Sequence, residues 1–380
     1  MATPRMDPSI LEIADIIRYP AAEEAFLREF GLVPTPSARP QATGTLQGRS
    51  PASEYWGICK DLGFNPGEPG CDGEVVTYNR RCKKGIRPSF KCNRCKKQLS
   101  QLRGTDALHG RQGQGSFFAF RDVLGRPNVK IARREVIWLT YAMIKGSSSR
   151  NTKELIEKEF KMSNTTRTDW RNYVREVALA ELLEQPPMGG VGQVVQIDEC
   201  LMRGRRKANR GRLLTGDNVP PRRRNNYGGV SDKGPWIFGM LCVSTKELRL
   251  FEVDKRDAAT LGPLIAKNVL PGTTVFSDEW AAYRCIPGLV NANGTPLNLD
   301  WHTVNHSVNF IDPATGANTQ RIESEWQKAK RRLVRNGNKT TPALMRSHLA
   351  WLWWRSVNAR PNVKDKFLRL IEAIARRYPL

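Results

Sequence analysis

Five of the eight cysteines in this chain of 380 residues lie between Cys59 and Cys95, and this cluster limits what the surrounding segment can fold into. Cys92 and Cys95 are separated by two residues, which is the spacing of a zinc-binding knuckle. Cys59 and Cys71 form a looser pair, and the Thr/Tyr/Val-rich residues 75–78 between the pairs are typical of a strand. Four thiolates around one tetrahedral Zn²⁺ stabilise a segment too small to bury its own core. The sequence therefore predicts a zinc ribbon with one structural Zn²⁺ and these four ligands.

The fifth cysteine of the cluster, Cys82, is an alternative ligand, because it could replace either Cys59 or Cys71. The competing interpretation is five unrelated thiols, which their close clustering disfavours. Eight cysteines in a chain of this length are too few for a secreted disulfide scaffold, and clustered cysteines inside a cell more often bind a metal.

Charge is the second constraint. The chain has 61 Lys+Arg against 37 Asp+Glu, a formal net charge of +24, which attracts a polyanion over a wide surface. Residues 80–103 carry ten of these basic side chains and no acid. Arg94, Lys96 and Lys97, beside the knuckle, are candidate contacts to a phosphate backbone. Nucleic acid is therefore the expected partner.

An anionic membrane is the rival for this charge, but the chain has no apolar run of about 18 residues that could span a bilayer. Glu12, Asp15, Glu23 and Glu24 interrupt the apolar stretch that a signal peptide would need. We expect an intracellular protein, located in the nucleus if the source is eukaryotic and otherwise in the cytoplasm with the nucleoid.

Residues 131–188 are predicted to form a helix-turn-helix domain of three helices, the third capped by Ser163. Arg167, Arg171 and Arg175 recur every four residues on the third helix, beside its apolar stripe, and would place a basic face in a major groove. The alternative is a generic three-helix packing unit with a solvated charged face.

After this domain the apolar spacing becomes that of strands, and acidic residues follow strands at two places. The strand 194–197 ends in Asp198-Glu199, and the strand 274–276 leads to Asp278. A carboxylate at the end of a buried strand is costly unless a metal or another cation neutralises it. Taken singly, however, such an Asp is more often a cap or a turn residue.

The order of elements around these acids is informative. Strands 236–243 and 248–253 follow the first acid and are predicted to be antiparallel, and Asp257 then caps a helix. A later helix, 320–335, carries both Glu323 and Glu325 beside its buried stripe, and periodicity cannot choose between them. This order is that of a ribonuclease H-like domain, in which three acids could converge on two Mg²⁺ about 4 Å apart for phosphodiester chemistry.

Seven phrases of the sequence, in order, resemble the Merlin superfamily of cut-and-paste DNA transposases, which are relatives of a group of bacterial insertion-sequence transposases. The phrases are Asp198-Glu199, Asn209-Arg210-Gly211-Arg212, Trp236-Ile237-Phe238-Gly239, Leu270-Pro271-Gly272-Thr273-Thr274, Ser277-Asp278-Glu279-Trp280 with Ala282-Tyr283, Val304-Asn305-His306-Ser307, and Ile322-Glu323-Ser324 with Trp326. The resemblance covers about residues 59–333 and is densest after residue 196.

In that family the catalytic triad is Asp, Asp, Glu, and its Glu belongs to the Ile-Glu-Ser phrase. The resemblance therefore implies a triad of Asp198, Asp278 and Glu323, which bind two Mg²⁺ or Mn²⁺ ions. The sequence departs from the family pattern at residues 213–234, where a Pro- and Arg-rich stretch is interposed before the second strand. His306 matches a motif position without an assigned role.

A basic run lies between the strand that ends at Asp198 and that stretch. Such a run is usually a solvated face, but its position after the predicted catalytic strand favours contact with a phosphate backbone. The candidate DNA contacts in this run are Arg205, Lys207, Arg210 and Arg212. Lys330, on the later helix, is a further candidate.

The predicted fold class is a multidomain α+β protein, with a zinc ribbon and a helix-turn-helix before a ribonuclease H-like catalytic domain (mixed sheet with flanking helices) and a helical C-terminus. The predicted domains are 1–31, an N-terminal helical segment in which a helix begins at Asp7-Pro8; 32–53, a linker; 54–130, the zinc-ribbon DNA-binding domain; 131–188, the helix-turn-helix DNA-binding domain; 189–340, the catalytic domain; and 341–380, the C-terminal helices.

The function that this organisation implies is cut-and-paste transposition: binding of terminal inverted repeats in double-stranded DNA, cleavage of the ends, and joining of the 3′-OH ends to target DNA. Because two ends must be paired, we expect a homodimer or a higher synaptic oligomer. The alternatives are a transposase-derived DNA-binding protein without activity, and a ribonuclease H-like nuclease that cuts without joining.

Overall fold

The computed structural model describes residues 5–33, 35–37, 54–82, 85–100, 117–119, 131–145, 160, 162–202, 236–305, 308, 310–335, 342–358, 360 and 362–378. The chain forms two compact units, one of residues 1–177 together with 364–380 and one of residues 178–363. Within the described ranges, none of the helices has the length and apolar composition that crossing a membrane requires.

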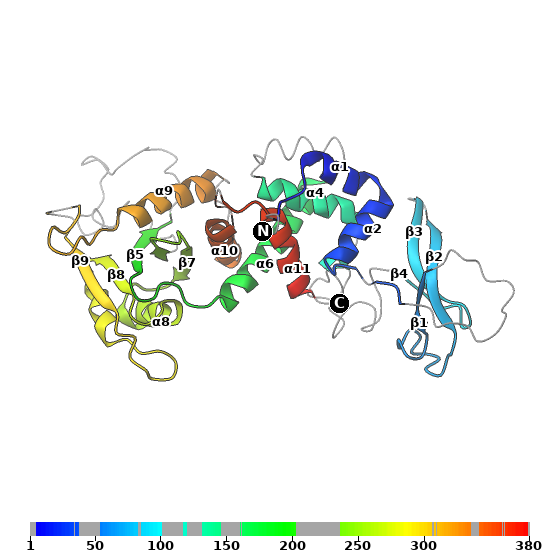
Figure 1. Cartoon of the computed structure of the whole chain (residues 1–380), viewed down its shortest axis with the longest axis horizontal. Helices are drawn as coiled ribbons and strands as arrows, with labels where there is room; N and C mark the ends of the chain where they lie inside the picture. The colour runs from blue at the N-terminus through cyan, green and yellow to red at the C-terminus, as the bar shows by residue number, and fades with distance from the viewer. Residues whose placement is uncertain are drawn as a thin grey trace, which may run out of the picture. The chain divides into compact units, whose positions relative to one another are not determined.

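Four helices of the first unit pack on one another: α1 (Ile10–Arg18), α2 (Pro20–Glu29), α4 (Arg133–Ile144) and α11 (Lys366–Arg377) (Figure 1). The helix expected from Asp7-Pro8 begins at Ile10 instead, because Ser9 accepts a hydrogen bond from the Glu12 amide and the Glu12 carboxylate accepts one from the Ser9 amide. Asp7 is thereby left to cap another helix. Its Oδ1 accepts hydrogen bonds from the first amides of α11, at Phe367 (2.7 Å) and Leu368 (3.2 Å).

Helix α6 (Asn164–Glu184) begins where the sequence predicts, because the Ser163 hydroxyl accepts a hydrogen bond from the Thr166 amide at 3.1 Å. Its apolar stripe, which includes Trp170, is buried. Trp170 makes an edge contact with Phe117 of the short helix η2 (Phe117–Ala119), with ring centroids 5.5 Å apart. The predicted second helix of the helix-turn-helix lies, apart from residue 160, outside the described residues.

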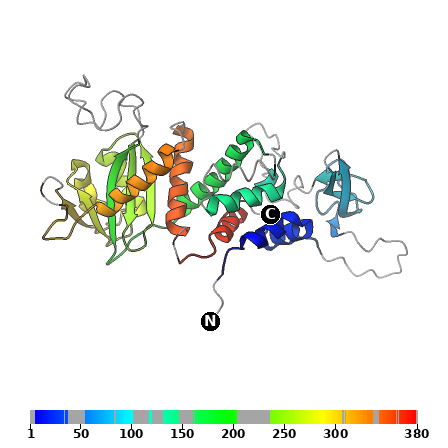
Figure 2. The ribbon, with the colours of Figure 1, turned by 90° about the horizontal axis from the view of Figure 1, so that it is seen from above.

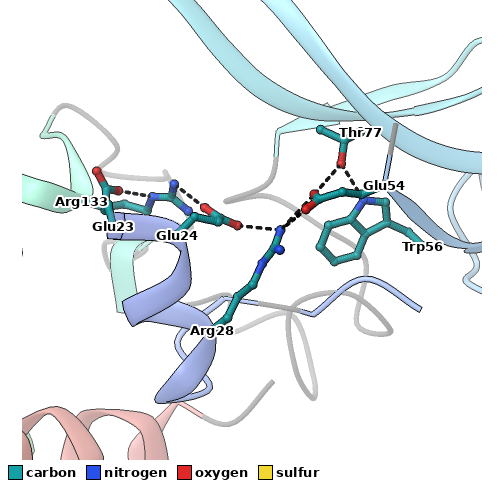
Figure 3. A network of polar contacts seen from close by, with 7 residues as sticks. All are labelled: Glu23, Glu24, Arg28, Glu54, Trp56, Thr77 and Arg133. Carbon is teal, nitrogen blue, oxygen red and sulfur yellow. Dashed lines mark hydrogen bonds and ion pairs between the residues drawn. The ribbon is translucent and has the colours of Figure 1, made fainter. Parts of the chain in front are cut away.

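A four-stranded antiparallel sheet completes the first unit. Its strands, in order, are β1 (Tyr55–Ile58), β2 (Glu74–Cys82), β3 (Gly85–Cys92) and β4 (Gln98–Ser100). Figure 3 shows how this sheet is joined to the helices. Arg28 of α2 contacts Glu54 and Glu24, and the neighbouring Glu23 and Glu24 bind Arg133 of α4.

The second unit is built on a five-stranded mixed sheet (Figure 2). Its strands are β5 (Val194–Leu201), β6 (Trp236–Cys242), β7 (Leu248–Val253), β8 (Thr274–Asp278) and β9 (Asp300–Val304), in the spatial order β7-β6-β5-β8-β9. β7, β6 and β5 are antiparallel, whereas β5, β8 and β9 are parallel. The predicted meander and the later parallel strand are confirmed, and β9 is an element that the sequence pattern did not predict.

Alternating residues of the sheet feed two apolar cores. One core, with Val195 and Ile197 of β5, involves α8 (Ala258–Asn268) and the 3₁₀ segment η3 (Ala281–Gly288). The other core involves α9 (Gln320–Arg335) and α10 (Pro342–Asn358), and contains Cys200 of β5 and Trp326 of α9. Because side chains alternate along a strand, each acid of β5 lies against a different pair of helices.

The two C-terminal helices belong to different units. α10 is fixed to the five-stranded sheet, because the Ser356 hydroxyl accepts a hydrogen bond from the Leu248 amide at 2.9 Å and Trp353 donates to Glu247 at 3.0 Å. α11 packs with α4 in the first unit. The sequence predicts residues 341–380 as one C-terminal helical segment. In the structure α10 packs in the second unit and α11 packs in the first.

Candidate active site and metal centre

Four thiols gather at one end of the ribbon sheet. The Sγ atoms of Cys59, Cys71, Cys92 and Cys95 all lie within 4.8 Å of one another. Cys59 and Cys95 are 3.8 Å apart and Cys71 and Cys92 are 3.7 Å apart, measured between the sulfurs. These distances are far longer than the roughly 2.05 Å of a disulfide, but they match the edge of about 3.8 Å of a tetrahedron with Zn–S bonds of about 2.3 Å. The donor set and its spacing fit one Zn²⁺.

The backbone around the thiols tunes their acidity. Burial and hydrogen bonds from the neighbouring thiols raise the pKa of Cys59. Burial also acts to raise the pKa of Cys95, but hydrogen bonds from the Lys97 amide and from Asn65 outweigh it and lower that pKa to about 7. The knuckle turns at Lys96, whose φ of 61° is left-handed. One thiol is thus prepared to ionise first, as metal binding requires.

The three basic residues of the knuckle are exposed. Arg94 forms an ion pair with Asp72, and Lys96 donates to the Asn93 carbonyl. The side chain of Cys82, at the end of β2, lies outside the described residues. The four cysteines expected as ligands are therefore the ones that the described structure brings together.

Asp198 and Asp278 lie on neighbouring parallel strands. The pairing of β5 with β8 runs from Val194 opposite Thr274 to Gln196 opposite Phe276. The same register, extended by two residues, sets Asp198 beside Asp278 on the face of the sheet that α9 covers. Neither strand can lose this alignment without moving its apolar residues out of the core.

Burial, together with the charges of Asp278 and Glu323, raises the pKa of Asp198 to about 7, against hydrogen bonds that lower it. Those bonds come from Trp326, whose Nε1 donates to Oδ2 at 2.9 Å, and from the Glu199 amide, which donates to Oδ1 at 2.8 Å. Because both of these charges act on Asp198, the three acids share one neighbourhood. Among the described residues the carboxylates do not approach as closely as the thiols do. Such a set of like charges binds a hard divalent cation.

Glu323 is positioned from β5 by Gln196, which is only 1% exposed. Gln196 Nε2 donates to Asn318 Oδ1 at 2.8 Å, and its Oε1 accepts a hydrogen bond from the Ile322 amide at 3.0 Å. Thr319 donates to the Glu323 carboxylate at 2.8 Å. Gln196 therefore fixes the first turn of α9 to the strand that carries Asp198. Sequence reasoning missed it, although a Gln within an apolar strand was the available signal.

Trp326 reaches Asp198 because the facing residue of β6 has no side chain. Gly239 pairs with Asp198 in the register, and a Cβ placed on it would lie 2.6 Å from Cζ2 of Trp326. Glu325, the other candidate acid of α9, instead forms an ion pair with Lys328. The structure thus associates Glu323, and not Glu325, with the aspartates.

A fourth acid, Glu199, occupies the opposite face of β5. Burial and the charges of Asp198 and Asp278 raise the pKa of Glu199 to about 7, and the hydroxyl of the buried Tyr283 acts to lower it. Arg256 lowers the same pKa by its positive charge. The sequence analysis identifies the Asp198-Glu199 phrase but does not predict that the Glu199 side chain is largely buried.

The remaining predicted DNA contacts have mixed positions. Arg167 and Arg171 of α6 are partly exposed, whereas Arg175 is only 7% exposed and burial lowers its pKa to about 10. Arg175 therefore packs inside the unit, unlike the exposed basic face that was expected. Lys330 is exposed on α9, and its ammonium contacts Cys200. Arg205, Lys207, Arg210, Arg212, residues 213–232 and His306 lie outside the described residues.

The second unit is thus an α/β domain in which a mixed sheet and a flanking helix gather acids suited to metal-dependent phosphodiester chemistry. Residues 190–355 match the family model of the ISXO2-like transposase domain, a match that includes all three acids and supports a DDE transposase family. No curated protein matches the chain.

Among solved structures, the chain is similar to one in the cryo-EM structure of a simian T-cell lymphotropic virus intasome in complex with PP2A regulatory subunit B56 gamma. The TM-score is 0.27 and the identity is 9%, over 62% of this chain and 74% of that chain.

Proposed function

We propose that this protein is a DDE-type DNA transposase of the Merlin superfamily, which cleaves the ends of its element and joins the 3′-OH ends to target DNA. The observation that carries the proposal is the electrostatic neighbourhood of Asp198, Asp278 and Glu323, brought from β5, β8 and α9 in the domain that matches a transposase family. The strand order with its acids is the ribonuclease H-like arrangement.

Asp198, Asp278 and Glu323 would hold two Mg²⁺ or Mn²⁺ ions. Ions bound there would supply Lewis-acid activation of the attacking and leaving oxygens of an in-line displacement. The protein contributes orientation. Trp326 and the Glu199 amide each hold one oxygen of Asp198, and Thr319 holds one oxygen of Glu323, so their free lone pairs point in fixed directions.

The chemistry is two displacements at phosphorus. In the first, water adds to the phosphodiester at the element's end and the 3′ oxygen leaves as a 3′-OH. In the second, that 3′-OH attacks a phosphodiester of the target, whose own 3′ oxygen leaves. Neither step requires a covalent enzyme intermediate.

The first unit is suited to hold the DNA. A Zn²⁺ bound by the four cysteines would fix the knuckle and present Arg94, Lys96 and Lys97 to the DNA backbone, while Arg167 and Arg171 of α6 would read a groove. The net charge of +24 supports a polyanionic partner. We infer that two chains pair two ends, and that the protein works where chromosomal DNA is found.

The experiment is a cleavage and joining assay with the full chain, a labelled duplex of the element's terminal inverted repeat, a target duplex and Mg²⁺. Cleavage followed by joining is the expected result. Asp198→Asn, Asp278→Asn and Glu323→Gln should bind the end but not cut it, and Glu325→Gln is the matched control that should cut. Binding without cleavage by the unaltered chain would instead identify a DNA-binding protein, and cleavage without joining a nuclease.

A further inference from the structure

Trp280 is a large aromatic residue that stays exposed beside the acidic cluster. Its side chain is 41% exposed, and it lies two residues after Asp278. The Trp280 amide donates to Asp278 Oδ1 at 3.0 Å, and its indole Nε1 donates to the Arg256 carbonyl at 3.0 Å. The indole is therefore held in position at both ends while part of its surface faces solvent.

The guanidinium of Arg256 forms a cation–π contact with the Trp280 ring. The Arg256 guanidinium carbon lies 4.9 Å from the centroid of Trp280 and 3.7 Å from that of Trp236. Arg256 immediately precedes Asp257, whose carboxylate caps α8, so its backbone is fixed as well. Its charge also acts on the buried Glu199. Trp236, Arg256 and Trp280 thus form a rigid stack, the Trp280 stack, next to the acids.

A rigid exposed indole next to a phosphodiester site is suited to stacking a nucleobase. Every base presents a π-face, and stacking on an aromatic side chain contributes about 1–3 kcal/mol per base. In an intact duplex those faces are covered by neighbouring bases, so the ring can reach only a base that is unpaired or displaced. The alternative role for Trp280 is to shield Arg256 from solvent. An indole with that role alone would not need to keep so much of its own surface exposed.

We propose that Trp280, backed by Arg256, stacks an unpaired base of the DNA strand next to the phosphodiester that Asp278 faces. This inference rests on the proposed function and deepens it, because it assigns the site a substrate with one displaced nucleotide. The displaced base would anchor the strand, so that its neighbouring phosphate stays over the acids during the displacement.

The first test is photocrosslinking of the full chain to a duplex that carries one extrahelical 5-iodo-2′-deoxyuridine. The proposal predicts a crosslink that mass spectrometry maps to Trp280, and a much weaker one with the same sequence fully paired. A crosslink confined to other residues would overturn it. This test uses the unaltered chain and so does not depend on how any variant folds.

The second test is a binding titration that compares the bulged and the fully paired duplex. Trp280→Ala should reduce the preference for the bulge about tenfold, the size expected for one lost stacking contact, whereas Trp280→Phe should retain most of it. Phe310→Ala is the matched control, since Phe310 is 74% exposed in the same unit, and it should leave the preference unchanged. An unchanged preference in Trp280→Ala, or an equal loss in Phe310→Ala, would refute the proposal.

The two proposals can fail separately. A chain that crosslinks through Trp280 but neither cuts nor joins DNA would retain the stacking site and lose the transposase function. A Trp280→Ala variant that cuts and joins ends at the rate of the unaltered chain would retain the function and overturn the stacking site.

Discussion

The thiols of the ribbon and the carboxylates of the second unit are both sets of metal-ligand residues, and they are held in different ways. The thiols come from 37 consecutive positions, 59–95, and their sulfurs already lie at the spacing of a zinc tetrahedron. Neutral thiols can share hydrogen bonds at that distance. The carboxylates come from three elements that are distant in the sequence, and the charges of Asp278 and Glu323 raise the pKa of Asp198, so like charge opposes a closer approach. In general a structural zinc site closes fully around its ion, whereas a catalytic metal site keeps an open position for substrate.

The largest expected effect follows from removing zinc. Chelation, or Cys92→Ser, should unfold residues 54–100, because Zn²⁺ binding supplies about 10–16 kcal/mol in small zinc domains. Hydrogen exchange should accelerate in the ribbon and remain slow in β5 to β8. Metal analysis should give one Zn per chain, and Cys82→Ser should keep it. Loss of zinc on Cys82→Ser alone would reject this ligand set.

Replacing a carboxylate should have the opposite effect on stability. Asp198→Asn should lower cleavage by about a thousandfold or more, since metal-assisted charge stabilisation is worth several kcal/mol. In Mg²⁺-free buffer at pH 8 it should also stabilise the second unit by about 1 kcal/mol, because a buried charge among like charges is removed. Urea unfolding measures this change in stability. A variant less stable than the unaltered chain would contradict the idea that repulsion between carboxylates destabilises the second unit.

The contact between Gly239 and Trp326 provides an intermediate effect. Gly239→Ala should cost about 1–3 kcal/mol and reduce cleavage, because the new methyl group displaces the ring that donates to Asp198. Gly288→Ala is the matched control, since no atom lies within 4 Å of its added Cβ and its φ is not left-handed. Thermal unfolding and the cleavage rate should separate the two variants, and equal behaviour would show that the contact is unimportant.

The smallest effect expected is a pH dependence of the second unit. The pKa values of Asp198 and Glu199 are about 7 in the folded chain and about 4 when unfolded, so the folded state holds these protons more tightly. Stability should therefore fall as pH rises from about 4 to about 7 and then level off, with a total change of about 1–2 kcal/mol after allowance for solvent screening. The check compares the zinc-loaded, Mg²⁺-free chain with an Asp198→Asn/Glu199→Gln variant, in which this fall should be reduced. A stability difference that rises with pH would contradict the assignment.

Much of the local structure could be predicted from the sequence. The strands at 194–197, 248–253 and 274–276, the cap at Asp257 and the helix at 320–335 are confirmed, because alternation, 3.6-residue spacing and capping chemistry act over a few residues. The predicted start of the first helix was wrong by two residues, since the cap is Ser9 and not Asp7. Both Asp7 and Ser9 are good capping residues, and only the folded unit gives Asp7 to α11.

The candidate site divides in the same way. The sequence by itself determined which acids end which strands, and family resemblance indicated Glu323. It could not show Gln196 fixing α9, Trp326 passing over Gly239 to reach Asp198, or the burial of Arg175.

Those features join residues about 40 to 130 positions apart, or depend on what covers a helix face, and no local pattern encodes such pairs. What the sequence determined was the order of elements and the residues with ligand chemistry, because backbone propensity and side-chain type are local properties. Which acids share a field, and which tryptophan remains in solvent, was decided by the tertiary structure, because pairing register and packing set the distances on which electrostatics depends.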